Sequence, residues 1–164
     1  MSIYYVYAMR QYETGKTKIG ITKDLLRRYK ELITANSAPL MLDWCFFAPD
    51  KKAALHMERQ LHGKFDDTWT IGEWFQLDSE DHKFMNCLQE FNHSALGAAS
   101  PEVAKHEFDY VHDIKQWGEK IANDYWNRTA SPKEKSDRNY YLRMMAADRR
   151  YKVRREYDAR QENA

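Results

Sequence analysis

The chain has 164 residues, enough for one medium-sized domain or for a small domain with an appendage. Its net charge of +1 does not by itself indicate a nucleic-acid-binding protein, and it contains neither a signal-peptide pattern nor an apolar run that could span a membrane. The two cysteines, Cys45 and Cys87, lack the spacing of metal ligands, so we expect free thiols in a reducing compartment, the cytoplasm.

The N-terminal residues predict a β-hairpin. Residues 3–9 are β-branched and aromatic, residues 13–16 have turn composition, and residues 17–21 read as the returning strand. Because side chains alternate along a strand, Tyr5 and Tyr7 are expected on the same face.

A helix is predicted after this hairpin, with Thr22 placed to cap it. Arg28 lies beside the apolar stripe of this helix, whereas Arg27 points almost directly away from it. We therefore expect Arg28, and not Arg27, to be held near the sheet. The stripe consists of Leu25, Tyr29, Leu32 and Ile33.

The next residues predict further strands and helices. Residues 40–48 form an apolar run typical of a buried strand, and Asp50 can cap a helix over residues 52–65. Residues 74–77 are expected as a short edge strand and residues 79–93 as another helix.

Glu58 and His62 lie four residues apart along the edge of the apolar face of the helix at 52–65. Burying a carboxylate without a partner is unfavourable, so Glu58 should either hold a metal ion or pair with Arg28. His62 would orient Glu58 or a bound water, or have a structural role only.

The C-terminal third predicts two long helices that form a hairpin, and the chain divides into residues 1–93, a linker at 94–100, and a helical region at 101–164. Residues 138–160 carry eight Lys/Arg against three Asp/Glu, a local excess of five positive charges. This segment either contacts nucleic acid or packs on its partner helix with its arginines in solvent. The nucleic-acid contacts predicted there are Arg143, Arg149, Arg150, Arg154 and Arg155.

Four side chains in the N-terminal part are those needed to hydrolyse a phosphodiester bond with one divalent metal. Arg28 would neutralise charge on the phosphate, and Glu58 would hold Mg²⁺ or Mn²⁺. Tyr7 and Lys18 would position or activate the attacking water. The alternatives are that Tyr7 only packs in the core and that Lys18 extends along the sheet into solvent.

The motifs Tyr5-Val6-Tyr7 and Lys18-Ile19-Gly20, followed by Arg28, Glu58 and the segment Gly72-Glu73-Trp74-Phe75, resemble the GIY-YIG endonuclease superfamily. The resemblance is to the phage and bacterial branch with Lys-Ile-Gly as its second motif. It covers about residues 3–77 and implies an α+β fold, with a small three-stranded antiparallel sheet flanked by helices and single-metal hydrolysis of nucleic acid. The helical hairpin would follow this domain. Lys18 stands where the family usually has a second tyrosine, which leaves the general base unassigned.

The predicted function is a metal-dependent endonuclease that acts on DNA, and nothing in the sequence separates DNA from RNA. The alternative is a nuclease-like module that no longer cleaves and that binds nucleic acid or a protein partner. The presence of lysine at position 18 favours this alternative, while the presence of both Arg28 and Glu58 favours the enzyme. The oligomeric state is not indicated.

Overall fold

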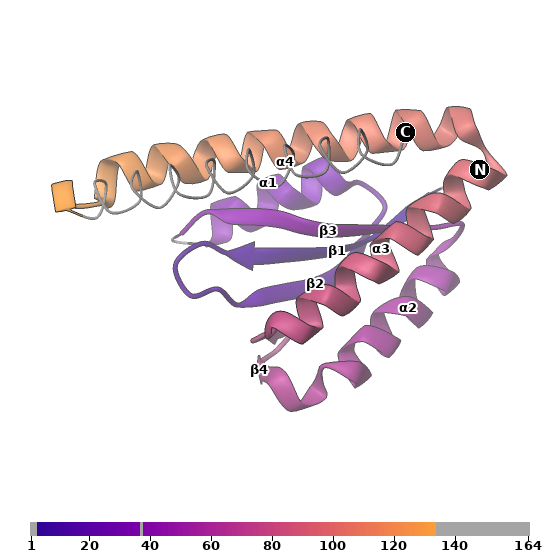
Figure 1. Ribbon diagram of the computed structural model, residues 1–164, viewed down its shortest axis with the longest axis horizontal. Helices are drawn as coiled ribbons and strands as arrows, with labels where there is room; N and C mark the ends of the chain where they lie inside the picture. Colours follow the sequence, from indigo (N-terminus) through magenta and orange to yellow (C-terminus); the bar gives the residue numbers. More distant parts are fainter. Residues whose placement is uncertain (1–2, 37, 134–164) are drawn as a thin grey trace, which may run out of the picture. The chain divides into compact units, whose positions relative to one another are not determined.

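The computed structural model describes residues 3–36 and 38–133. Its centre is a five-stranded antiparallel sheet with the strand order β3-β1-β2-β5-β4 (Figure 1). The expected three-stranded sheet is therefore wrong, although the strands predicted at residues 3–9, 17–21 and 40–48 are confirmed. The strands are β1 (Tyr4–Gln11), β2 (Thr17–Thr22), β3 (Leu40–Ala48), β4 (Trp69–Ile71) and β5 (Trp74–Phe75).

Two further strands, β4 and β5, are short. β5 falls within residues 74–77, the segment predicted as an edge strand, but β4 pairs with its other side, so the edge strand is β4 and not β5. β4 has three residues and β5 has two, which is too few to show an alternating pattern in the sequence. Gly72 turns the chain between them with a φ of 56°, a conformation that glycine adopts readily. β5 then pairs with Thr17 and Lys18 of β2, so the β4–β5 hairpin extends the sheet at that edge.

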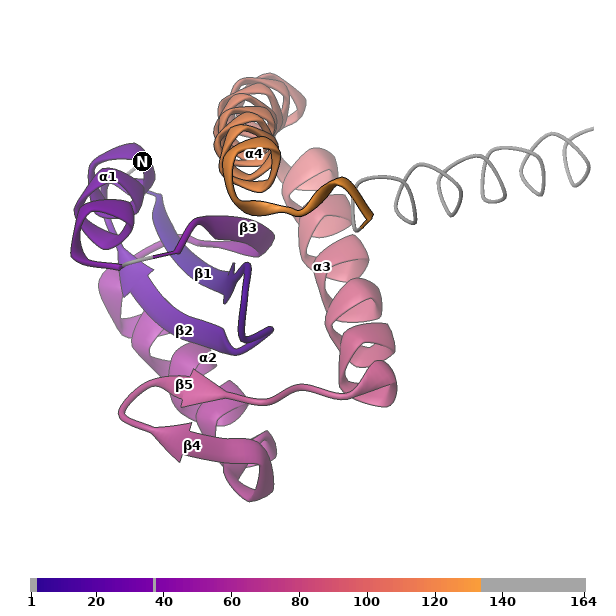
Figure 2. The same ribbon diagram turned by 90° about the vertical axis from the view of Figure 1, so that its left-hand side faces the viewer.

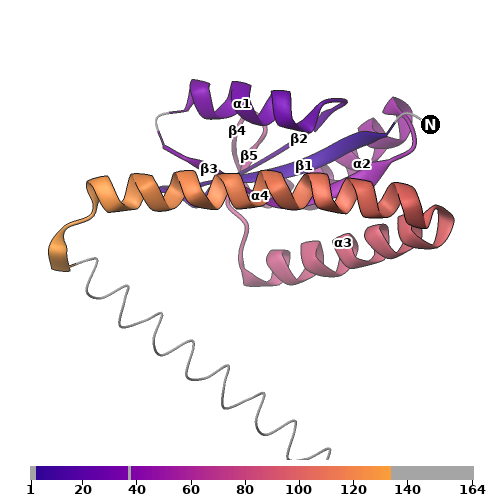
Figure 3. The same cartoon turned by 90° about the horizontal axis from the view of Figure 1, so that it is seen from above.

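Four helices cover the sheet. α1 and α4 contribute to the core on one face, and α2 and α3 contribute to the core on the other face. Figures 2 and 3 show α1 and α3 on opposite sides of the strands. No helix in the described part of the chain combines the length and the apolar character needed to cross a membrane. The helices are α1 (Leu25–Ala35), α2 (Lys51–Lys64), α3 (Ser79–Ala99) and α4 (Pro101–Thr129).

Aspartates cap the first two helices. The side chain of Asp24 accepts a hydrogen bond from the backbone N–H of Arg27, whereas the hydroxyl of Thr22 accepts one from the N–H of Asp24. The predicted cap at Thr22 is thus displaced by two residues. Asp50 caps α2 as predicted, accepting from the N–H of Ala53 at 2.8 Å.

The alternation along β1 divides the core into two layers. Tyr5 and Tyr7 share the face that packs against α1 and α4, as predicted, and Val6 and Ala8 share the face that packs against α2 and α3. Tyr7 therefore points towards α1, the helix that carries Arg28.

Helix α3 covers the outer edge of β3 with polar side chains. The N–H of Cys45 donates to Gln89, and the carbonyl of Cys45 accepts from Nε2 of His93 at 2.8 Å. Asn92 pairs with both backbone groups of Phe47, at 2.8 and 3.0 Å. These side chains take the place that a sixth strand would occupy and satisfy the buried backbone groups of the edge.

The connection between α3 and α4 differs from the linker predicted at residues 94–100. α3 continues to Ala99, so residues 94–99, expected as a linker, are helical. Residues up to Tyr125 form one compact unit. The second helix of the expected hairpin lies mostly outside the described residues, and the separate roles of residues 1–93 and 101–164 stay predictions.

Candidate active site

Tyr7 is at the centre of the candidate site. It lies in the middle of β1, directly opposite Gly20 of β2, and is only 1% exposed. A Cβ atom at Gly20 would lie 2.5 Å from the Tyr7 hydroxyl, so the phenol ring occupies the space above this glycine. Burial raises the pKa of the Tyr7 phenol, and the neighbouring Arg28 opposes this only in part. The phenol is therefore neutral at physiological pH.

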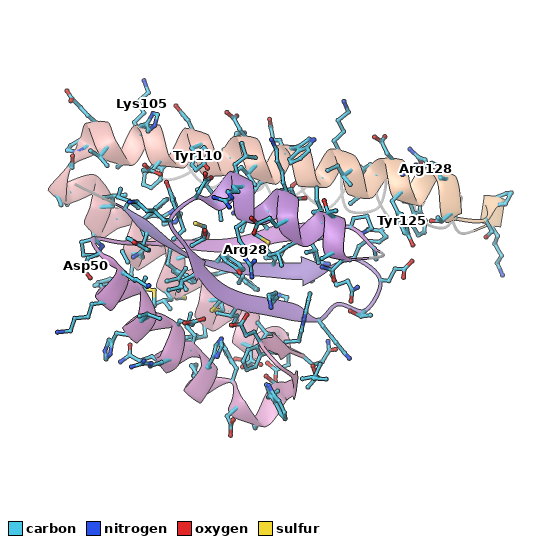
Figure 4. All side chains as sticks on the ribbon, turned by 180° about the vertical axis from the view of Figure 1, so that it is seen from behind. Arg28, Asp50, Lys105, Tyr110, Tyr125 and Arg128 are labelled. Carbon is cyan, nitrogen blue, oxygen red and sulfur yellow. The ribbon has the colours of Figure 1, made fainter. Side chains whose placement is uncertain are left out.

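Arg28, labelled in Figure 4, lies on α1, and its side chain reaches the Tyr7 hydroxyl. Its Nε–H donates to the hydroxyl oxygen at 3.1 Å, and its Nη1 contacts Glu31 at 3.4 Å. By contrast, the side chain of Arg27 is 78% exposed and pairs with Glu31 on the same helix. The prediction that Arg28 is the arginine held near the sheet is confirmed. Two of the five N–H donors of Arg28 are used within the described part of the chain, which leaves others for a phosphate.

Glu58 lies on α2, within electrostatic range of Tyr7. The carboxylate is half-buried, and within residues 3–36 and 38–133 it forms no ion pair, so the expected alternative of a pair with Arg28 is not found. Burial raises the pKa of the Glu58 carboxyl; His62 opposes the shift and Glu73 adds to it. The charge of Glu58 in turn raises the pKa of Tyr7, which places the two groups within electrostatic range.

His62 is oriented by the backbone of β2. Its Nε2 lies 3.0 Å from the carbonyl oxygen of Ile19. Because a carbonyl can only accept, this hydrogen bond assigns a proton to Nε2. The ring packs on Phe75, with 5.0 Å between centroids, so its orientation is fixed on two sides.

Lys18 is held by the β4–β5 hairpin. Its ammonium group lies 2.8 Å from the carboxylate of Glu73 and 5.6 Å from the ring centroid of Trp74, and its side chain is only 14% exposed. Both contacts involve the charged form of lysine. Lys18 therefore belongs to the site and does not extend freely into solvent.

Glu73 is the residue of this site that the sequence analysis missed. It pairs with Lys18, and its charge raises the pKa of both Tyr7 and Glu58. Its position in the segment Gly72-Glu73-Trp74-Phe75 was part of the resemblance, but no chemical role could be given to it without the pairing of β5 with β2.

The described residues fit a hard divalent cation that keeps most of its water ligands. They contain no group of three or more His, Cys, Asp or Glu side chains arranged to hold a metal ion. Mg²⁺ is commonly bound by one or two carboxylates together with substrate phosphates. Glu58, which has no ion-pair partner among the described residues and whose pKa is raised mainly by burial, is the carboxylate placed to hold such a cation.

The structure brings together five groups from four elements: Tyr7, Lys18, Arg28, Glu58 and His62. Their roles in catalysis and metal binding stay predictions. The predicted nucleic-acid contacts in the C-terminal segment, namely Arg143, Arg149, Arg150, Arg154 and Arg155, lie outside the described residues.

Comparison with known families corrects the resemblance. The model of the T5orf172 domain matches residues 2–92, while no GIY-YIG family model matches the chain. No curated protein and no solved structure matches it. The match to a distinct family overturns the assignment to the GIY-YIG superfamily, whose short motifs also occur here at similar spacing. Since the matched region spans more than half of the 164 residues, the chain belongs to the T5orf172 domain family.

Proposed function

We propose that this protein is a metal-dependent endonuclease that hydrolyses phosphodiester bonds in DNA. One observation supports this above all: a guanidinium from α1 donates to the hydroxyl of Tyr7, and a carboxylate from α2 lies within electrostatic range of the same phenol. A cation and an anion that converge on one buried phenol, without pairing with each other, suit a reaction in which a metal ion and a phosphate occupy the space between them.

Glu58 would hold the divalent cation. When bound, Mg²⁺ or Mn²⁺ would neutralise phosphate charge and acidify a water ligand. The carboxylate is available because it forms no ion pair within the described ranges, and burial keeps competing water from fully solvating it. Glu73, close enough to raise the pKa of Glu58, would contribute negative charge to the same cation.

Arg28 and Tyr7 would stabilise the phosphate as negative charge develops on it. The hydroxyl of Tyr7 already accepts a hydrogen bond from Arg28, so its own proton is left to be donated to a phosphate oxygen or to the attacking water. Because the pKa of Tyr7 is raised by burial, the phenol donates and does not act as a base. The Tyr7 hydroxyl would thus position the attacking water or the phosphate.

His62 would accept the proton from the attacking water. Its Nε2–H is committed to the carbonyl of Ile19, which leaves Nδ1 as the acceptor, and it lies one helical turn from Glu58. Lys18, which Glu73 and Trp74 hold in place, would bind phosphate through its ammonium group.

Incubation of the purified full-length protein with supercoiled plasmid tests this proposal. Nicked and linear products are expected with Mg²⁺ or Mn²⁺ and not with excess EDTA. The variant Glu58→Gln should lose at least about 10²-fold in rate. Glu80→Gln, which removes an exposed carboxylate on α3, is the matched control and should cleave like the wild type. Equal cleavage by Glu58→Gln and the wild type would reject Glu58 as the metal ligand and point to a contaminating nuclease.

The second candidate is a nuclease-like module that binds nucleic acid or a protein without cleaving. It is favoured by the ion pair of Lys18 with Glu73, because the lysine charge is then already balanced. The same plasmid assay separates the two candidates, because the binding module would leave the plasmid intact at every metal concentration. The same assay with an RNA substrate, run in parallel, shows whether the protein cleaves DNA or RNA.

The proposed setting is the cytoplasm. Cys45 is buried and Cys87 is exposed, and both are free thiols in the structure. This fits a reducing compartment, in which an exposed thiol stays reduced. Measurement of free thiols in protein recovered from fractionated cells would test it.

A further inference from the structure

The charges of this protein are not distributed evenly among its helices. α1 carries three Lys/Arg and one Asp/Glu, and α2 carries four and one. α3 carries one Lys/Arg and three Asp/Glu, and α4 carries four Lys/Arg and six Asp/Glu. The two helices that supply the candidate active site are therefore positive, and the other two are negative, although the whole chain is nearly neutral. A polyanion is attracted to α1 and α2 and repelled from α3 and α4.

On α2, a row of residues follows the flank that carries the candidate site. Lys51, Leu55, Arg59 and His62 succeed one another at intervals of three or four residues, so they share one side of the helix, and Glu58 lies on this side. Lys51 and Arg59 are exposed. Eight residues of helix separate them, which corresponds to about 12 Å along the axis.

The surface along this row is hollowed. An open depression of about 770 Å³ lies over the first half of α2, whose start is marked by Asp50 in Figure 4. Among the described residues, Lys51, Lys52 and Arg59 have no ion-pair partner, in contrast to Lys18 and Arg28. The residues that line the depression are Asp50, Lys51, Lys52, Ala53, Leu55, His56 and Arg59.

We infer that the exposed flank of α2 that carries Lys51 and Arg59 binds the phosphodiester backbone of duplex DNA beside Glu58. This inference rests on the proposed function for its substrate. A span of about 12 Å covers roughly three base steps of one strand, since the rise is about 3.4 Å per nucleotide. The unpaired cations can each neutralise a phosphate without first breaking an ion pair, and none of them belongs to the C-terminal segment that the sequence alone indicated.

The test is the salt dependence of DNA binding by the full-length protein, measured by fluorescence anisotropy of a labelled duplex in EDTA, so that no cleavage occurs. The double variant Lys51→Gln/Arg59→Gln should lower the slope of log affinity against log salt by about 1.8, because each lost phosphate contact removes about 0.9. At 0.1 M salt its affinity should fall by between about 10- and 100-fold. The matched control is Lys105→Gln/Lys120→Gln, which removes the same charge from α4 and should change the slope little.

An unchanged slope for the α2 variant would overturn the inference, and so would an equal loss of slope in the α4 control. Melting temperatures of all three proteins show whether the variants fold. The plasmid assay, run in parallel, keeps this inference separate from the proposed function. If cleavage depends on metal but the α2 variant has an unchanged slope, the proposed nuclease function stands and DNA binding by the α2 surface is rejected. If the α2 variant has a reduced slope but none of the proteins cleaves the plasmid, DNA binding by the α2 surface stands and the proposed nuclease function is rejected.

Discussion

The phenol ring of Tyr7 fills the space that a side chain at Gly20 would need. The two residues face each other across β1 and β2, and a Cβ at Gly20 would lie 2.5 Å from the hydroxyl oxygen and 2.7 Å from the ring carbon that bears it. Because Tyr7 is buried, the ring has no open side to move into. The absence of a side chain at Gly20 therefore fixes the point at which the hydroxyl meets Arg28.

The variant Gly20→Ala should displace the ring of Tyr7. We expect a loss of about 1–3 kcal/mol in the free energy of unfolding, typical of overpacking, and a larger relative loss of cleavage because the hydroxyl moves. Denaturant unfolding and the plasmid assay measure the two effects. Gly63→Ala is the control: nothing lies within 4 Å of its added Cβ, and alanine within α2 should stabilise by about 0.5–1 kcal/mol.

Replacement of Arg28 by lysine should greatly reduce cleavage and change stability little. A lysine cannot donate to Tyr7 and also offer a planar pair of donors to a phosphate, so a loss of about 10²-fold is expected. Arg27→Lys makes the same change at the neighbouring, exposed position and should cleave at the wild-type rate. Comparable losses in both variants would mean that net charge on α1 matters and the contact with Tyr7 does not.

Glu73→Gln should shift the pH dependence of cleavage. The charge of Glu73 raises the pKa of Glu58, so its removal lowers that pKa, and Glu58 becomes ionised at lower pH. The acidic limb of the rate profile should therefore move to lower pH. Loss of the partly exposed pair with Lys18 should change stability by no more than about 1 kcal/mol. A limb that stays in place would show that Glu58 does not govern it.

Glu58→Gln should remove a pH-dependent destabilisation of the fold. The pKa of Glu58 is raised in the folded state, mainly by burial, so the folded protein binds its proton more tightly than the unfolded chain does. The wild type is then destabilised as pH rises from the unfolded pKa through the folded pKa, and the effect is complete above it. Relative to the wild type, the glutamine variant should gain stability over this range and keep the gain at neutral pH. Chemical unfolding at a series of pH values without metal would detect it.

Local periodicity was sufficient to predict much of the site. The phase of α1 selected Arg28 over Arg27, and the phase of α2 placed Glu58 beside the apolar face, because both follow from the 3.6-residue repeat alone. The alternation of β1 placed Tyr5 and Tyr7 together for the same reason. These inferences need no knowledge of the tertiary structure.

Interactions between distant segments could not be predicted in this way. The contact between Lys18 and Glu73 joins residues 55 positions apart and depends on the pairing of β5 with β2, which no local pattern in the sequence indicates. The cap at Asp24 was misplaced because Thr22, two residues earlier, has equally suitable chemistry. The family was misassigned because short motifs at similar spacing do not distinguish one family from another.

The polar side chains that α3 lays along β3 also have a consequence for the behaviour of the protein at high concentration. An edge strand with free backbone groups invites strands of other molecules, and such pairing starts many aggregates. Here Gln89, Asn92 and His93 occupy the backbone groups of Cys45 and Phe47 on one border of the sheet. The opposite border is a strand of only three residues, too short to template a long ladder. Helix α3 therefore protects this edge of the sheet against self-association, because the side chains that it places against β3 are polar and bind the backbone of that strand.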